Sequence, residues 1–299
     1  MAAARSLTAL LALAFGWVVI VGGTVSALWL LFLPLLEQAM PDLRRFTEPA
    51  LRSTLLFGLA VALLHYLIFL ATPTAYHIRR LCHPYKPVRL AQTHPLSQAT
   101  AQLAQRMQVP PPDLWLVDAQ IPNAYALSGL RRGAILLTTP LVEAFPANEL
   151  RWVLAHELAH LKHGDTRSGV FWVTAIQTLR LGYRLRAWLV RTLSATLQAI
   201  PYLWVLEFVT LLPALLLLYG LTWVERSARG VFKGVDLFIG RRMEYRADRE
   251  AAWLLGPEAG VSALQRLGGE FEPNWGNLFA THPPIRRRIR KLCQHQRRR

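Results

Sequence analysis

The chain has 299 residues, of which 53% are hydrophobic and only 17% are charged, which is too apolar for a simple soluble enzyme of one or two domains. Its formal net charge of +16 comes mostly from arginine. Because no nucleic-acid-binding motif accompanies this charge, we expect a lipid bilayer with anionic headgroups, and no nucleic acid, as a partner. The two cysteines, Cys82 and Cys293, are too few for a disulfide framework.

Residues 1–72 are predicted to form an N-terminal transmembrane hairpin. The runs 6–36 and 53–72 contain no Asp, Glu, Lys or Arg, and each can cross a hydrocarbon core of about 30 Å. The first run is longer than the apolar part of a signal peptide and lacks a convincing cleavage site, so we expect an uncleaved anchor. Basic residues after the second run favour a multi-pass protein of the inner (plasma) membrane, with a cytoplasmic N-terminus and a cytoplasmic catalytic unit.

Residues 73–165 are predicted to form that catalytic unit, with a small β-sheet. Proline in a first helical turn and capping residues predict helices over 95–107, from Thr139 and from Asn148. Short apolar segments predict strands at 113–117, 123–127 and 134–138.

The helix from Asn148 carries two histidines with metal-ligand spacing. His156 and His160 are four residues apart, so both imidazoles lie on one helix face at the separation that two ligands of one metal ion need. Glu157 beside them can take a proton from a metal-bound water and return it to a leaving amine. The pattern therefore predicts zinc-dependent peptide hydrolysis, with one zinc ion per chain.

Residues 166–224 are predicted to be a hydrophobic insertion, forming a second transmembrane hairpin. Taken alone, 168–198 reads as an amphipathic helix in the membrane interface, whereas 200–224 is long enough to span. If a later residue joins the two histidines at one metal ion, the insertion must cross the bilayer an even number of times. We favour two crossings, with Arg184 paired to Glu207 at membrane depth.

Residues 225–299 are predicted to supply the third ligand and to end in basic helices. A histidine six residues after His160 is excluded, because Thr166 stands there. Glu244 is the best candidate for the third ligand, with Glu250 and Glu225 as alternatives, on a helix predicted over 241–255. Asp248, one turn after Glu244, can accept a hydrogen bond from a ligand histidine. Pro257 is expected to open another helix, and the arginine-rich helix at the end of the chain is expected to rest on lipid headgroups.

These motifs resemble those of the HtpX-like and CaaX prenyl protease family of integral-membrane zinc metallopeptidases, of the gluzincin type. The resemblance rests on His-Glu-x-x-His at 156–160 and on Glu-x-x-x-Asp at 244–248 after a hydrophobic insertion. Three further segments match, at Pro122-Asn123-Ala124-Tyr125-Ala126, His163-Gly164-Asp165 and Thr281-His282-Pro283-Pro284. The fold it implies is that of a mainly α membrane protein (α+β), with transmembrane helices and a zincin-like catalytic unit that holds a small sheet and the metal helix.

The resemblance also implies a role for each matched residue. His156, His160 and Glu244 would bind zinc, Glu157 would be the general base, and Asp248 would orient a ligand. The strand with Asn123, Ala124, Tyr125 and Ala126 would border the cleft and pair with an extended substrate. His282 would approach the site and donate a hydrogen bond to the oxyanion or the substrate carbonyl. The alternatives are a turn role for His282 and helix-end roles for His163 and Asp165.

Together these features predict a membrane-embedded zinc endopeptidase that acts at the cytoplasmic membrane face. The resemblance implies polypeptide substrates such as damaged or misfolded membrane proteins. A protease of lipidated C-terminal peptides is a narrower alternative. A zinc-stabilised membrane adaptor that binds polypeptides without cutting them is an alternative from another class, and the presence of Glu157 argues against it.

Overall fold

The computed structural model describes residues 74–127, 133–166, 204–269 and 283–296, with isolated positions within 56–72 and 184–195. The chain divides into two compact units. One holds Met1–Arg5, Leu70–Gly169 and Val235–Arg299, and the other holds Ser6–Phe69 and Val170–Gly234. The first unit contains the predicted catalytic residues.

The predicted membrane anchors fall mainly outside the described residues. The run 6–36 lies there entirely, and 53–72 and 168–198 do so apart from isolated positions. In the part of the chain that the structure describes, no helix is both long enough and apolar enough to span a membrane. The predicted pair of Arg184 and Glu207 also falls outside the described residues, because the side chain of Glu207 is not among them.

A mixed four-stranded sheet forms one layer of the catalytic unit. Its strands are β1 (Val88–Arg89), β2 (Asp113–Val117), β3 (Ala124–Leu127) and β4 (Ala134–Thr138), in the order β1-β2-β4-β3. The strand β4 is parallel to β2 and antiparallel to β3, with Leu116 opposite Leu137 and Tyr125 opposite Leu136. All five residues of β4 are buried, as expected of a central strand. This order leaves β3 at an edge of the sheet.

Seven helices have their bounds within the described residues, and local signals explain those of α4 and α6. They are α3 (Thr74–Cys82), α4 (Pro95–Arg106), α5 (Thr139–Ala144), α6 (Ala147–His163), α8 (Trp204–Leu255), α9 (Pro257–Gly269) and α10 (Ile285–Gln296). The side chain of His94 caps α4 by accepting a hydrogen bond from Leu96 N at 3.2 Å, and Pro95 fills the first turn. The helix α6 begins one residue earlier than predicted, after Pro146, and ends at Gly164, whose φ of 65° suits a glycine.

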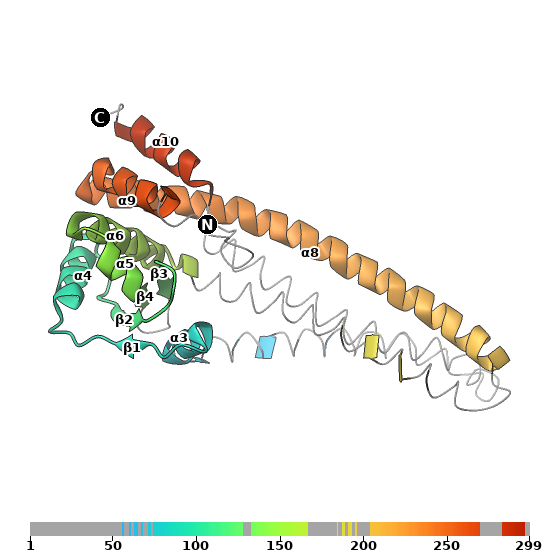
Figure 1. Ribbon diagram of the computed structural model, residues 1–299. Coiled ribbons are helices and arrows are strands. Elements are labelled where there is room, and N and C mark those ends of the chain that lie inside the picture. Colours follow the sequence, from blue (N-terminus) through green and yellow to red (C-terminus); the bar gives the residue numbers. More distant parts are fainter. Residues whose placement is uncertain are drawn as a thin grey trace. The chain divides into compact units, whose positions relative to one another are not determined.

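The helix α6 is the centre of the hydrophobic core. Figure 1 shows it between the sheet and α9, and it packs against β3, α4 and α9. Leu154, Ala155, Leu158 and Ala159 are all fully buried in this core. Because α6 contacts every neighbouring layer, its polar residues have fixed positions relative to the sheet and α9.

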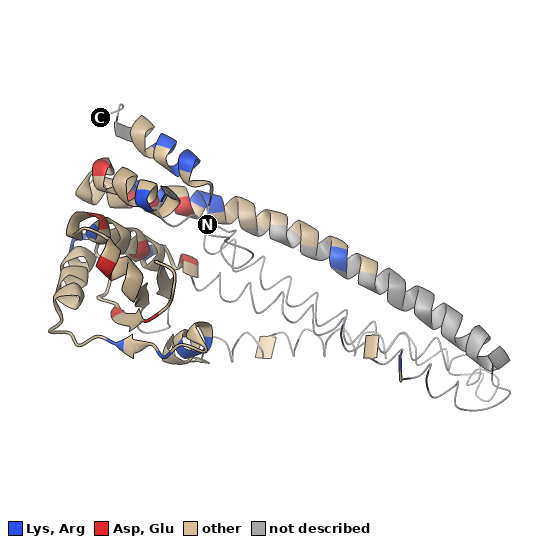
Figure 2. Cartoon of the chain, viewed as in Figure 1, with Lys and Arg blue, Asp and Glu red and all other residues tan. Residues whose placement is uncertain are grey.

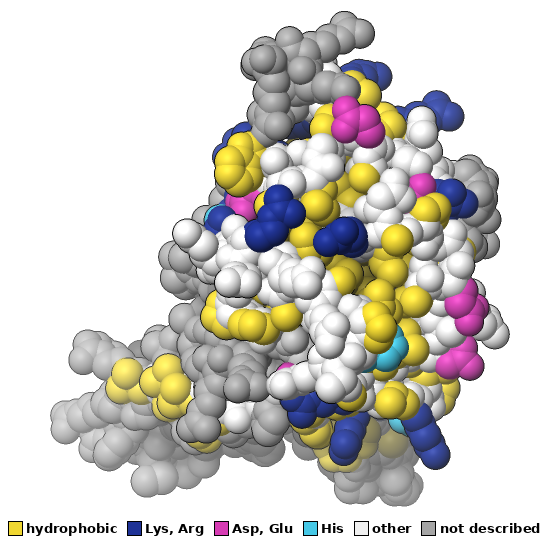
Figure 3. Space-filling model, turned by 90° about the vertical axis from the view of Figure 1, so that its left-hand side faces the viewer, with side chains coloured by type: hydrophobic (Ala, Val, Ile, Leu, Met, Phe, Trp, Pro, Cys, Tyr) yellow, Lys and Arg dark blue, Asp and Glu magenta, His cyan; other side chains and the backbone are white. Residues whose placement is uncertain are grey.

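One face of the helix α10 belongs to the core, and contact of its other face with lipid headgroups stays a prediction. Arg288 and Leu292 are buried, and Ile285 and Ile289 are partly buried against α9, whereas Arg286, Arg287 and Arg290 are exposed. Figure 2 shows basic residues along α10 and in the C-terminal part of α8. On the face in Figure 3, basic side chains lie beside hydrophobic ones. On α10, Arg286, Arg287 and Arg290 are therefore at the surface, and Arg288 is an exception.

Candidate metal centre

The helix α6 and the C-terminal part of α8 bring three potential ligands together. His156, His160 and Glu244 each offer one ligand atom, all within 4.8 Å of one another, and all three residues are buried. The two Nε2 atoms are 3.1 Å apart, and they lie 3.5 and 3.4 Å from the carboxylate oxygens of Glu244. Ligand atoms at 2.0–2.1 Å from a tetrahedral zinc ion are separated by roughly 3.3 Å. The three side chains therefore fit a zinc ion.

The charges around these side chains also favour a cation. Among the described residues, the carboxylates of Glu157, Asp165, Glu244 and Asp248 surround the two histidines, and the guanidinium groups of Arg246 and Arg288 accompany them. When both histidines are neutral, as ligands of a metal ion must be, these groups carry an excess of two negative charges, which a divalent ion would balance. Burial lowers the pKa of His160, but hydrogen bonds to Asp165 and Glu244 outweigh burial and raise this pKa to about 10.

Glu157, the predicted general base, is buried beside the ligands. It is 7% exposed and lies in the middle turns of α6. Burial raises the pKa of Tyr125 well above its usual range, a hydrogen bond with Asn123 lowers it, and the charge of Glu157 raises it further. The charge of Glu157 therefore acts on both His160 of α6 and Tyr125 of β3.

Asp248 holds the first ligand histidine and is itself held by an arginine. His156 Nδ1 donates to Asp248 Oδ1 at 3.0 Å, which leaves Nε2 with a lone pair for a metal ion. Arg288 of α10 donates to both oxygens of Asp248, at 2.8 Å from Nε and 2.5 Å from Nη2. Its Nη1 lies 3.5 Å from Glu244 Oε2. Burial raises the pKa of Asp248, but Arg288 and His156 outweigh burial and keep this pKa below its ordinary value.

Asp165 holds the second ligand histidine in the same way. His160 Nδ1 donates to Asp165 Oδ2 at 3.0 Å, and Arg246 Nη2 lies 2.6 Å from each oxygen of Asp165. Asp165 was expected only to cap or orient the helix end, and here it contacts a ligand instead. His163 donates to Glu250 Oε1 at 2.6 Å, so Glu250 is engaged elsewhere and does not join the three potential ligands.

Trp152 buttresses the first ligand from within α6. Its ring stacks on His156 with centroids 5.5 Å apart and an interplanar angle of 27°, and the residue is 1% exposed. A Cβ added to Gly260 of α9 would lie 2.4 Å from this ring. Only glycine therefore allows α9 to approach so closely.

The segment with Asn123, Ala124, Tyr125 and Ala126 forms the edge of the sheet. Thr138 N donates to Asn123 O at 3.0 Å, so this pair is hydrogen-bonded, and in an antiparallel ladder such pairs alternate. The backbone groups of Ala124 and Ala126 therefore point away from β4. Asn123 Oδ1 accepts from Ala124 N at 2.8 Å. Of the other predicted residues, His282 lies outside the described residues, as does the side chain of Glu225.

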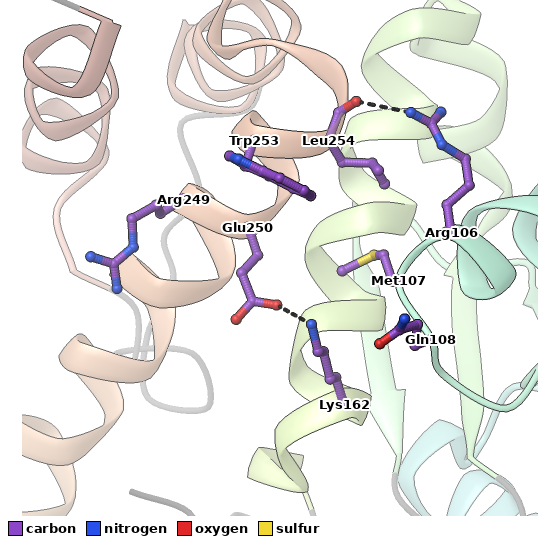
Figure 4. Close-up of a pocket in the computed structure, with 8 residues that line it drawn as sticks. All are labelled: Arg106, Met107, Gln108, Lys162, Arg249, Glu250, Trp253 and Leu254. Carbon is purple, nitrogen blue, oxygen red and sulfur yellow. Dashed lines mark hydrogen bonds and ion pairs between the residues drawn. The ribbon is translucent and has the colours of Figure 1, made fainter. Parts of the chain in front are cut away.

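A pocket of about 480 Å³ lies apart from these ligands. Figure 4 shows its lining residues, Arg106, Met107, Gln108, Lys162, Arg249, Glu250, Trp253 and Leu254. None of the three potential metal ligands lines it, and the guanidinium groups of Arg106 and Arg249 point in different directions. Arg106 donates to Leu254 O at 3.4 Å, and Lys162 lies 3.3 Å from Glu250. The pocket is therefore distinct from the metal centre.

Three residues of the centre have no counterpart in the sequence-based prediction: Trp152, Arg246 and Arg288. Arg246 lies inside the Glu-x-x-x-Asp segment, and Trp152 lies one turn before His156. Arg288 is remote in sequence from the other residues of the site, so no local pattern connects it to them.

Comparisons with known proteins match this centre to a known family. A family model of peptidase family M48 matches residues 90–296. A protease HtpX homolog of Acidiphilium cryptum (strain JF-5) is 32% identical over 217 residues, covering 64% of this chain and 70% of that protein. One of Janthinobacterium sp. (strain Marseille) is 30% identical over 220 residues, covering 66% and 70%. The crystal structure of S. mikatae Ste24p shares the fold, with a TM-score of 0.52 and 19% identity, over 90% of this chain and 64% of that one. Because the matched residues contain both the metal motif and the acidic third residue, the chain belongs to the HtpX-like members of peptidase family M48 and is a metallopeptidase.

Proposed function

We propose that this protein is a zinc-dependent endopeptidase that cleaves membrane-associated or misfolded membrane proteins. The observation that carries the proposal is the convergence of His156, His160 and Glu244, with Glu157 on the same helix as the histidines. A purely structural zinc site needs no carboxylate base beside its ligands. The presence of Glu157 therefore favours catalysis over a non-cleaving adaptor.

Each residue of the centre has a proposed task. His156, His160 and Glu244 hold the metal ion through the atoms that converge. When bound, zinc polarises the scissile carbonyl and makes water more acidic. Glu157 takes a proton from the attacking water and later gives it to the leaving nitrogen. The burial of Glu157 limits access by bulk solvent, so the transferred proton stays near the reacting groups.

The edge strand β3 is the proposed substrate platform. The outward carbonyl of Ala124 and the outward N–H and carbonyl of Ala126 can pair with an extended peptide, as in strand addition, whereas Ala124 N already donates to Asn123 Oδ1. We propose that His282 donates a hydrogen bond to the substrate carbonyl oxygen. Replacing Ala126 by proline removes one outward N–H and no N–H of the β3–β4 ladder. Loss of one such bond, about 0.5–1.5 kcal/mol, should lower kcat/KM roughly 2- to 13-fold, with unchanged zinc content.

A membrane setting explains the rest of the chain. We propose a transmembrane hairpin within 1–72, a catalytic unit over 73–165, a second hairpin within 166–224 and a C-terminal part over 225–299. In support, exposed basic and apolar side chains follow the second anchor: Arg79, Arg80, Leu81, Tyr85, Lys86, Val88 and Arg89. Such a mixture suits an anionic cytoplasmic membrane face. A cysteine introduced at Thr196 should be labelled only from the face opposite the catalytic unit; labelling from the catalytic side would rule out the second hairpin.

The decisive experiment is cleavage of an unfolded reporter protein by the detergent-purified full chain after zinc loading. Glu157→Gln should abolish cleavage and keep one zinc ion per chain, because it removes the base and no ligand. Glu244→Ala should remove the metal ion. Cleavage by the Glu157→Gln variant would refute the assigned base. Full zinc retention by Glu244→Ala would move the third-ligand role to another residue.

A further inference from the structure

We propose that Arg246 is a positioning residue of the metal centre, which fixes the ligand His160 through Asp165. The inference rests on the proposed function, namely that His156, His160 and Glu244 hold a zinc ion. It concerns a residue that touches neither the ligands' metal-binding atoms nor the substrate strand. Its role is to set the direction in which one ligand presents its lone pair.

Arg246, Asp165 and His160 form a chain of contacts. Arg246 Nη2 lies 2.6 Å from both oxygens of Asp165, and one of these oxygens accepts from His160 Nδ1 at 3.0 Å. A carboxylate that accepts at Nδ1 selects the tautomer with a bare Nε2 and fixes the plane of the ring. Asp165 is 2% exposed, and both Arg246 and His160 contact its carboxylate.

The ion pair of Arg246 and Asp165 connects the two segments that carry the potential ligands. Asp165 directly follows the C-terminal glycine of α6, whereas Arg246 is two residues after the ligand Glu244 on α8. The ion pair therefore joins the end of the helix that supplies two ligands to the turn that supplies the third. The ion pair keeps the two segments at the separation at which their three ligand atoms can bind one ion.

The contacts around His160 repeat those around His156, with different helices supplying the aspartate and the arginine. There, Asp248 of α8 accepts from the histidine, and Arg288 of α10 fixes the aspartate. Each ligand histidine thus has its own aspartate and its own arginine. Arg249, on the same helix, is exposed and has no polar partner among the described side chains, so it serves as a matched control.

A purely electrostatic role and a positioning role of Arg246 predict opposite changes in zinc affinity when its side chain is removed. Loss of a positive charge beside a cation site strengthens cation binding by Coulomb attraction alone. Loss of a residue that orients a ligand weakens binding, typically 10- to 100-fold for such outer partners. The sign of the change in zinc affinity therefore separates the two roles.

The experiment measures zinc affinity of the full chain in detergent by competition with a chromophoric chelator, together with the visible spectrum of the cobalt-substituted protein. Arg246→Ala should weaken zinc binding by about 10- to 100-fold and shift the cobalt bands, Arg246→Lys should restore part of the affinity, and Arg249→Ala should change neither. Asp165→Asn should weaken binding similarly, and combining it with Arg246→Ala should add little, because the arginine acts through the aspartate.

The outcomes separate this inference from the proposed function. Unchanged or tighter zinc binding by both Arg246 variants, with a wild-type cobalt spectrum, would overturn the positioning role and leave the proposed zinc site intact. Additive losses in the double variant would overturn it as well. A wild-type chain that binds no zinc would overturn both proposals. If Arg246→Ala does not fold, the Arg246→Lys variant and its zinc dissociation rate decide the question.

Discussion

Gly260→Ala tests whether the close approach of α9 to Trp152 supports the metal centre. The added Cβ would lie 2.4 Å from the ring, against a usual carbon contact of about 3.5–4.0 Å. The ring cannot retreat freely, because it is 1% exposed and stacks on His156. Overpacking of this kind costs about 1–3 kcal/mol. Since the overlap exceeds 1 Å, we expect the upper part of this range.

Alanine also favours the helix, by about 0.8–1.0 kcal/mol over glycine, which offsets part of that cost. We therefore expect a net loss of about 1–2 kcal/mol in the free energy of unfolding, or roughly 2–8 °C in Tm. Thermal unfolding of the detergent-solubilised chain measures the loss, and chelator competition measures the accompanying fall in zinc affinity. Gly234→Ala in α8 is the matched control, because a Cβ there meets nothing within 4 Å. If Gly260→Ala stabilised the chain as much as Gly234→Ala, with unchanged zinc affinity, the reasoning would be refuted.

Three further substitutions have defined outcomes. Arg288→Ala leaves Asp248 buried without its arginine and should destabilise the fold by about 3–5 kcal/mol, with weaker zinc binding; wild-type unfolding would contradict this. Glu149→Gln removes a charged carboxylate that accepts hydrogen bonds from two residues of α9. It should lower the free energy of unfolding, measured by chemical denaturation, by about 1–3 kcal/mol. The pKa of Glu250 is lowered, because its pairing with His163 outweighs burial, so its stabilising effect is present above pH 4.5 and fades as pH falls through the lowered value. Wild type should therefore exceed Glu250→Gln in Tm near neutral pH and lose this advantage in acid.

Local patterns predicted the elements that position the site. The helix expected over 95–107 is Pro95–Arg106, and the expected strands agree with β2, β3 and β4 to within a residue. These segments carry strong signals, such as proline at a helix start and short apolar runs between turns. The two-residue strand β1 was not predicted, because it is too short for any periodicity and exists only through its pairing with β2. The spacing of His156 and His160 needed only helix geometry, so the structure brings them together as expected.

Long-range pairing was less accessible from the sequence. The strand β4 lies between β2 and β3, and this strand order is set by packing and not by the residues of one strand. Glu244 and Glu250 both stood on the same predicted helix as ligand candidates. The structure separates them because Glu250 lies on the side of α8 that meets His163, whereas Glu244 faces the ligand histidines. That distinction depends on how α8 is rotated against α6.

The buried arginine of the centre was hidden by the abundance of arginine in the chain. With 34 lysines and arginines, a basic helix at the C-terminus favours an explanation in terms of lipid headgroups. Yet Ile285, Arg288, Ile289 and Leu292 recur at helical spacing, which places Arg288 on the apolar face of α10. A charge on an apolar face must find a partner, because an unpaired buried charge is costly. The surface that α10 covers must therefore carry an acidic residue, and Asp248 meets this requirement while it holds a ligand histidine.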